Sequence, residues 1–67
     1  MSANNYILIQ KEPRDYVVTH RDADTHKING LKMRYETLEE AVRYAQKLVR
    51  ECEEDGYGVE YGIRLDI

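Results

Sequence analysis

The segment from His20 to His26 holds the side chains of this sequence that could form a metal site. His20, Asp22, Asp24 and His26 stand at alternate positions, and imidazole nitrogens and carboxylate oxygens are common ligands of divalent cations. In an extended strand these four side chains would spread along roughly 20 Å at ~3.3 Å per residue, which is too far for one ion. Asp is also frequent in turns. We therefore interpret the segment as a polar loop and expect no metal and no cofactor.

Catalysis by a nucleophile requires a hydroxyl or thiol that is activated by a nearby base. Ser2 lies close to the N-terminus and Cys52 falls on an apolar stripe, and neither has a His near it in the sequence. The glycines around Tyr57 and Tyr61 lack the Lys and the following helix of a phosphate-binding loop. We predict no catalytic residues and expect that the protein is not an enzyme.

The clearest pattern runs from Thr37 to about Cys52 and predicts one amphipathic helix. Thr37 and Glu40 form a capping box at its start, and Gly56 indicates its end. The side of the helix opposite the apolar stripe is charged. The stripe occupies an arc of about 120°, the width that a core-facing helix needs, and consists of Leu38, Ala41, Val42, Ala45, Leu48, Val49 and Cys52.

Two short runs rich in aromatic and β-branched residues, 6–10 and 16–20, predict a β-hairpin with a five-residue turn. Both faces of this hairpin are apolar, although one helix can cover only one face of a sheet. A symmetric turn pairs Ile9 with Val17 and Ile7 with Thr19 on one face, and Leu8 with Val18 and Gln10 with Tyr16 on the other.

Residues 21–30 allow two interpretations. The second strand could continue through a bulge near Asp22 and turn tightly at Asn29-Gly30, a dipeptide that favours type I′ turns. We favour a long loop, followed by a strand at 31–35 that directs Lys32 and Arg34 away from the helix. The alternation from Val59 to Ile67 predicts the last strand.

Together these elements predict an α+β fold, a two-layer sandwich of ββ(β)αβ order. One amphipathic helix is expected to pack on one face of a three- to four-stranded sheet. Residues 6–67 are predicted to form a single domain, and residues 1–5 a disordered tail. The order of the strands in space is left open.

The composition is typical of a globular protein that folds in water, with 42% hydrophobic residues, 34% charged residues and a net charge of −3. No apolar run approaches the ~20 residues of a membrane span, so we expect no membrane association. One cysteine cannot form an intramolecular disulfide, and the N-terminus lacks a signal-peptide pattern, which predicts a cytoplasmic location. The acidic excess lies mostly on the predicted helix.

The sheet face away from the helix is the candidate interaction surface. It would combine aromatic, aliphatic and basic side chains, a mixture that is enriched in protein interfaces. The same mixture could stack on single-stranded nucleic acid, which the net charge disfavours, or it could be ordinary surface. The predicted surface residues are Tyr6, Leu8, Tyr16, Val18, Lys32, Arg34 and Arg64.

Three segments, Tyr6-Ile7-Leu8-Ile9, Tyr16-Val17-Val18 and Thr37-Leu38-Glu39-Glu40-Ala41, together resemble the β-hairpin and helix start of HicB-type antitoxin domains. Those domains are small proteins that neutralise a partner by binding it. The resemblance covers about half of the chain and implies that this architecture can serve as a binding module. The Pro-Gly-Cys element that often follows the second strand in that family has no counterpart here.

We therefore expect a small non-enzymatic binding or regulatory module that acts through protein contact on its open sheet face. Its partner would be another protein or a second copy of itself in a homodimer or other homo-oligomer. The alternative is a protein that binds single-stranded nucleic acid through the same face.

Overall fold

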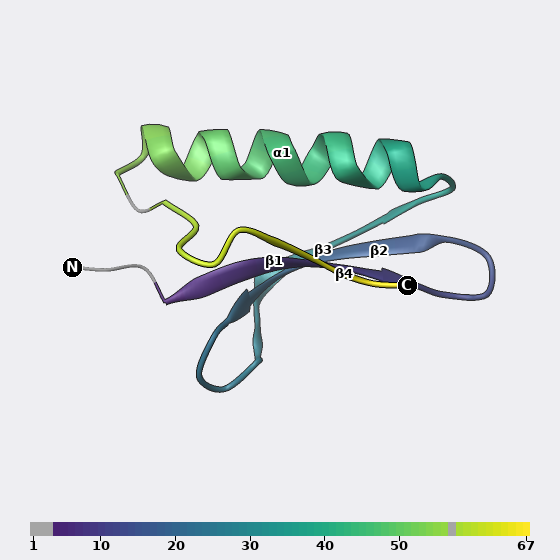
Figure 1. Cartoon of the computed structure of the whole chain (residues 1–67), viewed down its shortest axis with the longest axis horizontal. Coiled ribbons are helices and arrows are strands. Elements are labelled where there is room, and N and C mark those ends of the chain that lie inside the picture. Colours follow the sequence, from purple (N-terminus) through teal and green to yellow (C-terminus); the bar gives the residue numbers. More distant parts are fainter. Residues whose placement is uncertain (1–3, 57) are drawn as a thin grey trace.

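The computed structural model describes residues 4–56 and 58–67. Within them the chain forms strands β1 (Asn5–Lys11), β2 (Tyr16–Asp22) and β3 (Ile28–Tyr35), then helix α1 (Leu38–Glu54) and strand β4 (Ile63–Asp66). The strands form one four-stranded sheet in the order β3-β2-β1-β4, in which β4 alone runs parallel to its neighbour β1. Helix α1 lies over one face of this sheet (Figure 1). The predicted α+β class is confirmed.

Local signals define both ends of α1, as the sequence predicts. The Thr37 hydroxyl oxygen accepts a hydrogen bond of 3.2 Å from the backbone N–H of Glu40, and the same hydroxyl donates to the Glu40 carboxylate at 3.0 Å. At the other end, the N–H of Gly56 donates to the carbonyl of Glu53 at 3.1 Å. Gly56 has a φ of 85°, a left-handed conformation that glycine adopts without steric cost.

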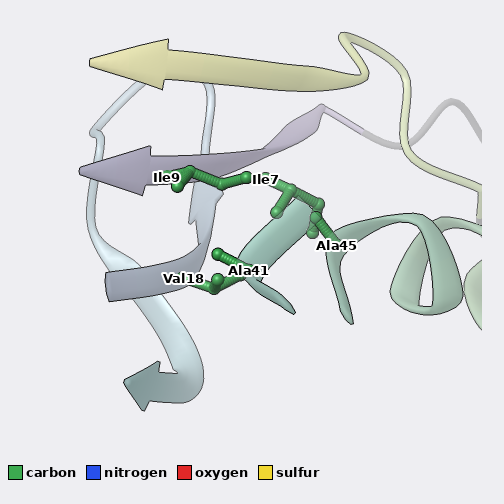
Figure 2. Packing of buried hydrophobic residues seen from close by; sticks show 5 residues of the cluster. All are labelled: Ile7, Ile9, Val18, Ala41 and Ala45. Carbon is green, nitrogen blue, oxygen red and sulfur yellow. The ribbon is translucent and has the colours of Figure 1, made fainter. Parts of the chain in front are cut away.

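The core lies between α1 and the two central strands. Figure 2 shows Ile7 and Ile9 of β1 and Val18 of β2 pointing toward Ala41 and Ala45 of α1. All five side chains are fully buried. The two alanines let the helix backbone approach the sheet, and each buried Ile or Val contributes about 1.5–3 kcal/mol.

The β1–β2 ladder differs by one residue from the predicted pairing. Ile9 lies opposite Val18 rather than opposite Val17. The connecting loop has the four residues 12–15 instead of five, and it is closed by a 2.9 Å bond from the N–H of Glu12 to the carbonyl of Asp15. Successive side chains of a strand point to opposite faces, so this shift exchanges the two faces of β2. The predicted register is therefore wrong.

The β2–β3 connection matches neither of the two interpretations. The turn comprises residues 23–27, and Asn29-Gly30 lies inside β3 instead of forming a turn. The register shifts between Thr19 and Arg21, and Gly30 has a φ of 77°. The Asp22 carboxylate accepts the backbone N–H groups of Asp24 and Thr25, at 2.8 and 3.0 Å, and so stabilises the turn. In Figure 1 this turn projects away from α1.

Strand β4 is shorter than the predicted strand, because residues 58–62 form a loop. Gly58 and Gly62 have φ values of 71° and 69°, which interrupt an extended chain. The Asn5 side chain holds this loop: its Nδ2 donates to the carbonyl of Gly58 at 3.3 Å, and its Oδ1 accepts the N–H of Glu60 at 3.1 Å. Asn5, which the sequence places in a tail, is thus part of the sheet. Residues 1–3 of that predicted tail lie outside the described residues.

Candidate interaction surface

The side of the sheet opposite α1 is built by the side chains that alternate with the core residues. Because Ile7, Ile9 and Val18 point toward the helix, their neighbours in each strand point away from it. We call this side the open face. Its residues are Tyr6, Leu8 and Gln10 of β1, Val17, Thr19 and Arg21 of β2, Ile28, Lys32 and Arg34 of β3, and Arg64 and Asp66 of β4.

The structure brings together most of the predicted surface residues, but not two of them. Tyr6, Leu8, Lys32, Arg34 and Arg64 lie on the open face. Val18 instead belongs to the core and Tyr16 packs against it, on the helix side of the sheet. The prediction for these two residues is wrong because the hairpin loop is one residue shorter than expected. Val17 and Thr19, which the sequence places under the helix, lie on the open face instead, but only 2% and 1% of them are exposed.

Tyr6 contacts two other side chains on the open face. Its hydroxyl and the Nδ1 atom of His26 are 2.8 Å apart, and the two rings meet edge to face. The guanidinium of Arg64 lies over the Tyr6 ring, with Cζ 4.7 Å from the ring centroid. Only 4% of Tyr6 is exposed, although α1 lies on the other side of the sheet. A turn residue and a β4 cation therefore cover the aromatic ring.

Arg21 connects the β2–β3 turn to the open face through hydrogen bonds. Its Nε atom donates to Thr19 Oγ1 at 3.0 Å, and its two terminal nitrogens donate to the Gln10 side chain at 3.3 Å and to the His26 carbonyl at 3.0 Å. Sequence reasoning missed Arg21 and His26 as surface residues because it assigned both to a loop. The position of Arg21 on β2 opposite Ile28 depends on the register shift, which alternation alone does not reveal.

The two sides of the molecule carry opposite charges. On the open face Arg21, Lys32, Arg34 and Arg64 outnumber Asp66. Arg34 is partly neutralised by the hairpin loop, since its guanidinium lies 3.3 and 3.4 Å from two loop carboxylates, Glu12 and Asp15. The exposed charged residues of α1 are five acids and three bases, a net negative charge: Glu39, Glu40, Glu51, Glu53 and Glu54 against Arg43, Lys47 and Arg50.

The four residues of the possible metal segment do not converge. His20 pairs with Ile7 and faces the helix side of the sheet, whereas His26 contacts Tyr6 on the open face. The bonds that Asp22 accepts from Thr25 and Asp24 lower the pKa of its carboxyl, so this group serves the turn. Within residues 4–56 and 58–67, no group of three or more His, Cys, Asp or Glu side chains is arranged to hold a metal ion.

Cys52 is half-buried on α1. Burial, together with the nearby carboxylates of Asp55 and Glu51, raises the pKa of its thiol. A raised pKa keeps the thiol protonated at neutral pH, and the protonated form is a poor nucleophile.

Among the described residues, no helix has the length and apolar character that crossing a membrane requires. Comparisons of the chain with protein-family models, curated proteins and solved structures find no match. Function is therefore inferred from the geometry of the open face.

Proposed function

We propose that the protein is a small cytoplasmic binding module without enzymatic activity, which regulates another protein by contact through its open face. The observation that supports this proposal most is the stack of Arg64 on Tyr6 beside Leu8. An arginine that is held in position, next to an aliphatic side chain at the centre of a sheet, is the kind of group that contributes strongly to protein interfaces.

Arg64 is prepared for binding because its contact with Tyr6 defines its position. The Tyr6 ring lies under its guanidinium, and the His26 contact in turn orients that ring. Holding a side chain in place before binding reduces the entropy that association costs. The planar guanidinium presents paired N–H donors, which match the two oxygens of a carboxylate.

Leu8 supplies the apolar part of the proposed contact. It is half-buried on the central strand β1, between Thr19 of β2 and Arg64 of β4. Lys32 lies next to Thr19 on β3 and extends the cationic surface. A partner that fits this arrangement presents an aliphatic side chain surrounded by carboxylates. Such charge complementarity accelerates association and orients the partner away from the acidic side of α1.

Two observations favour a protein partner over single-stranded nucleic acid. The Tyr6 ring is covered by Arg64, and Tyr16 lies on the other side of the sheet. The open face, as far as the structure describes it, thus lacks an exposed aromatic ring on which a base could stack. Base stacking on such rings is a main source of affinity for single strands.

The experiment compares two charge reversals in capture of proteins from the native host lysate. Lys32→Glu changes the open face, and Lys47→Glu is the matched control on the exposed side of α1. We expect a captured protein that Lys32→Glu loses and Lys47→Glu retains, and amide exchange of the purified complex should show protection on β1 and β3. Equal capture by both variants would contradict the proposal. Micromolar binding of a single-stranded 20-mer at physiological salt, lost in Lys32→Glu, would favour nucleic acid instead.

A further inference from the structure

Strand β4 has an unpaired outer edge. It is the last strand in the order β3-β2-β1-β4, and within the described residues no strand pairs with its other side. The Gly62 carbonyl accepts the N–H of Ile7 at 2.9 Å, so the backbone groups at 62, 64 and 66 face β1. Those of Ile63 and Leu65 face outward, and Ile67 follows the end of the strand. An edge of this kind is a template for pairing with another strand.

The side chains on this edge are apolar and exposed on the helix side of the sheet. Leu65 pairs with Ile9 and shares its face, yet 55% of Leu65 is exposed, and Ile67 after it is 63% exposed. Ile63 is half-buried and packs against the core. Arg64 and Asp66 point to the open face. One side of the edge is thus aliphatic, and the other carries one cation and one anion.

The sequence of this edge is complementary to itself when it is reversed. Ile63-Arg64-Leu65-Asp66-Ile67 has Leu at its centre, Ile at both ends, and opposite charges at the two positions between them. In an antiparallel pair centred on Leu65, the two leucines lie opposite each other. Arg64 then lies opposite Asp66 of the second copy, and Ile63 opposite Ile67 of the second copy. The order is the same read from either chain, as a two-fold symmetric contact requires.

We propose that two copies of this chain pair their β4 strands antiparallel about Leu65 and form one continuous sheet. The outward backbone groups of Ile63 and Leu65 supply the hydrogen bonds of this ladder, and pairing extends the strand to Ile67. Leu65 and Ile67 of both copies cover one another on the helix side. Two ion pairs between Arg64 and Asp66 form on the open face, where directly opposite side chains of a non-hydrogen-bonded pair lie closest.

Charge selects this register among the neighbouring ones. A pair centred on Arg64 would place the two arginines opposite each other, and one centred on Asp66 would do the same with the two aspartates. Like charges directly opposite are destabilising. The other edge strand, β3, does not offer the same match, because a pair centred on Met33 would place Lys32 opposite Arg34 of the second copy. Charge therefore disfavours the equivalent contact, centred on Met33, at the β3 edge.

This dimer shares Arg64 with the proposed function, but Leu8 and Lys32 lie outside its contact and stay accessible. It would place two open faces side by side and double the surface available to a partner. Failure of the dimer would therefore leave the proposed binding face untouched.

Variants in which the charge at position 64 or 66 is reversed test the proposal. Sedimentation equilibrium measures the dimer dissociation constant of each. The wild type should form dimers, and Asp66→Arg and Arg64→Asp should each raise the dimer dissociation constant at least ~tenfold because like charges then lie opposite. An equimolar mixture of these two variants should form heterodimers, since the two basic side chains of one copy then face the two acidic side chains of the other. A loss of fold in either variant could not produce this recovery.

Two lysine substitutions complete the test. Leu65→Lys should reduce dimerisation, whereas Met33→Lys, at an exposed position on the other edge strand, should not. Circular dichroism checks that every variant is folded. A wild type that is monomeric at about 1 mM, a concentration that exceeds the dissociation constants of specific dimers, would overturn the proposal. So would a mixture of the two charge variants without heterodimers.

Discussion

The guanidinium of Arg64 lies over the ring of Tyr6, with Cζ 4.7 Å from the ring centroid. This contact joins β4 to β1 on the open face, beside the backbone ladder that joins the same two strands. It links the stability of the fold to the arrangement of the proposed binding surface.

The first prediction concerns this pair. Replacing Arg64 with Ala should lower the free energy of unfolding by about 0.5–1 kcal/mol, the usual size of a cation–π contact at an exposed site. Urea denaturation of wild type, Arg64→Ala, Tyr6→Leu and the double variant measures the coupling energy between the two side chains. Additive effects of the two single substitutions would show that the contact contributes no stability. The measurement is made at a concentration where the chain is monomeric.

The second prediction concerns His20 and pH. Burial lowers the pKa of His20 from its ordinary value of 6.5, and its Nε2 atom is buried without a hydrogen-bond partner among the described residues. The unfolded chain therefore binds a proton at a pH where the folded chain does not. Neutral, half-buried His20 therefore contributes to the free energy of unfolding above pH 6.5. This contribution is lost as the pH falls toward the lower pKa of the folded state, because protonation of His20 then favours the unfolded chain.

Thermal unfolding at about pH 7.5 and about pH 5.5 checks this expectation. The wild type should lose more stability between these two conditions than His20→Leu, which removes the titrating group and fills the space with an apolar side chain. Every other titrating group is common to both proteins, so it cancels in the comparison. The same pH dependence in both proteins would show that His20 does not control it.

The third prediction concerns Asn5, whose side chain holds the loop before β4 at two points. Asn5→Ala should cost about 1–2 kcal/mol, because two hydrogen bonds are lost. It should also increase amide exchange selectively in β4 while α1 stays protected. Asn29→Ala, at an exposed position of β3, is the control. Uniform loss of protection across the chain would contradict a local role for Asn5.

The helix could be predicted from the sequence because its signals are local. Thr37, Glu40 and Gly56 define its ends, and the stripe that contains Ala41 and Ala45 defines its buried side. The strand register could not be predicted in the same way. Val17 and Val18 are both apolar and β-branched, so either suits the core, and a loop of four rather than five residues decides between them. Sequence periodicity does not specify the length of that loop.

The candidate surface was predictable where strict alternation holds. Lys32, Arg34 and Arg64 follow from the apolar residues next to them, and the structure places all three on the open face. His26 reaches Tyr6 only because the turn at 23–27 bends toward that face, and this depends on the register shift between β2 and β3. Contacts between a turn and a distant strand leave no periodic signal in a sequence.

The central claim is that the open face binds a protein partner through the region around Leu8. The most direct measurement is a binding isotherm between this chain and the protein that it captures from its host, with Leu8→Asp and the control Gln46→Asp on the exposed side of α1. Leu8→Asp removes the apolar contact and places a carboxylate beside Arg64, so we expect affinity to fall at least ~tenfold while Gln46→Asp binds like the wild type. Wild-type affinity in a folded Leu8→Asp variant would contradict the claim.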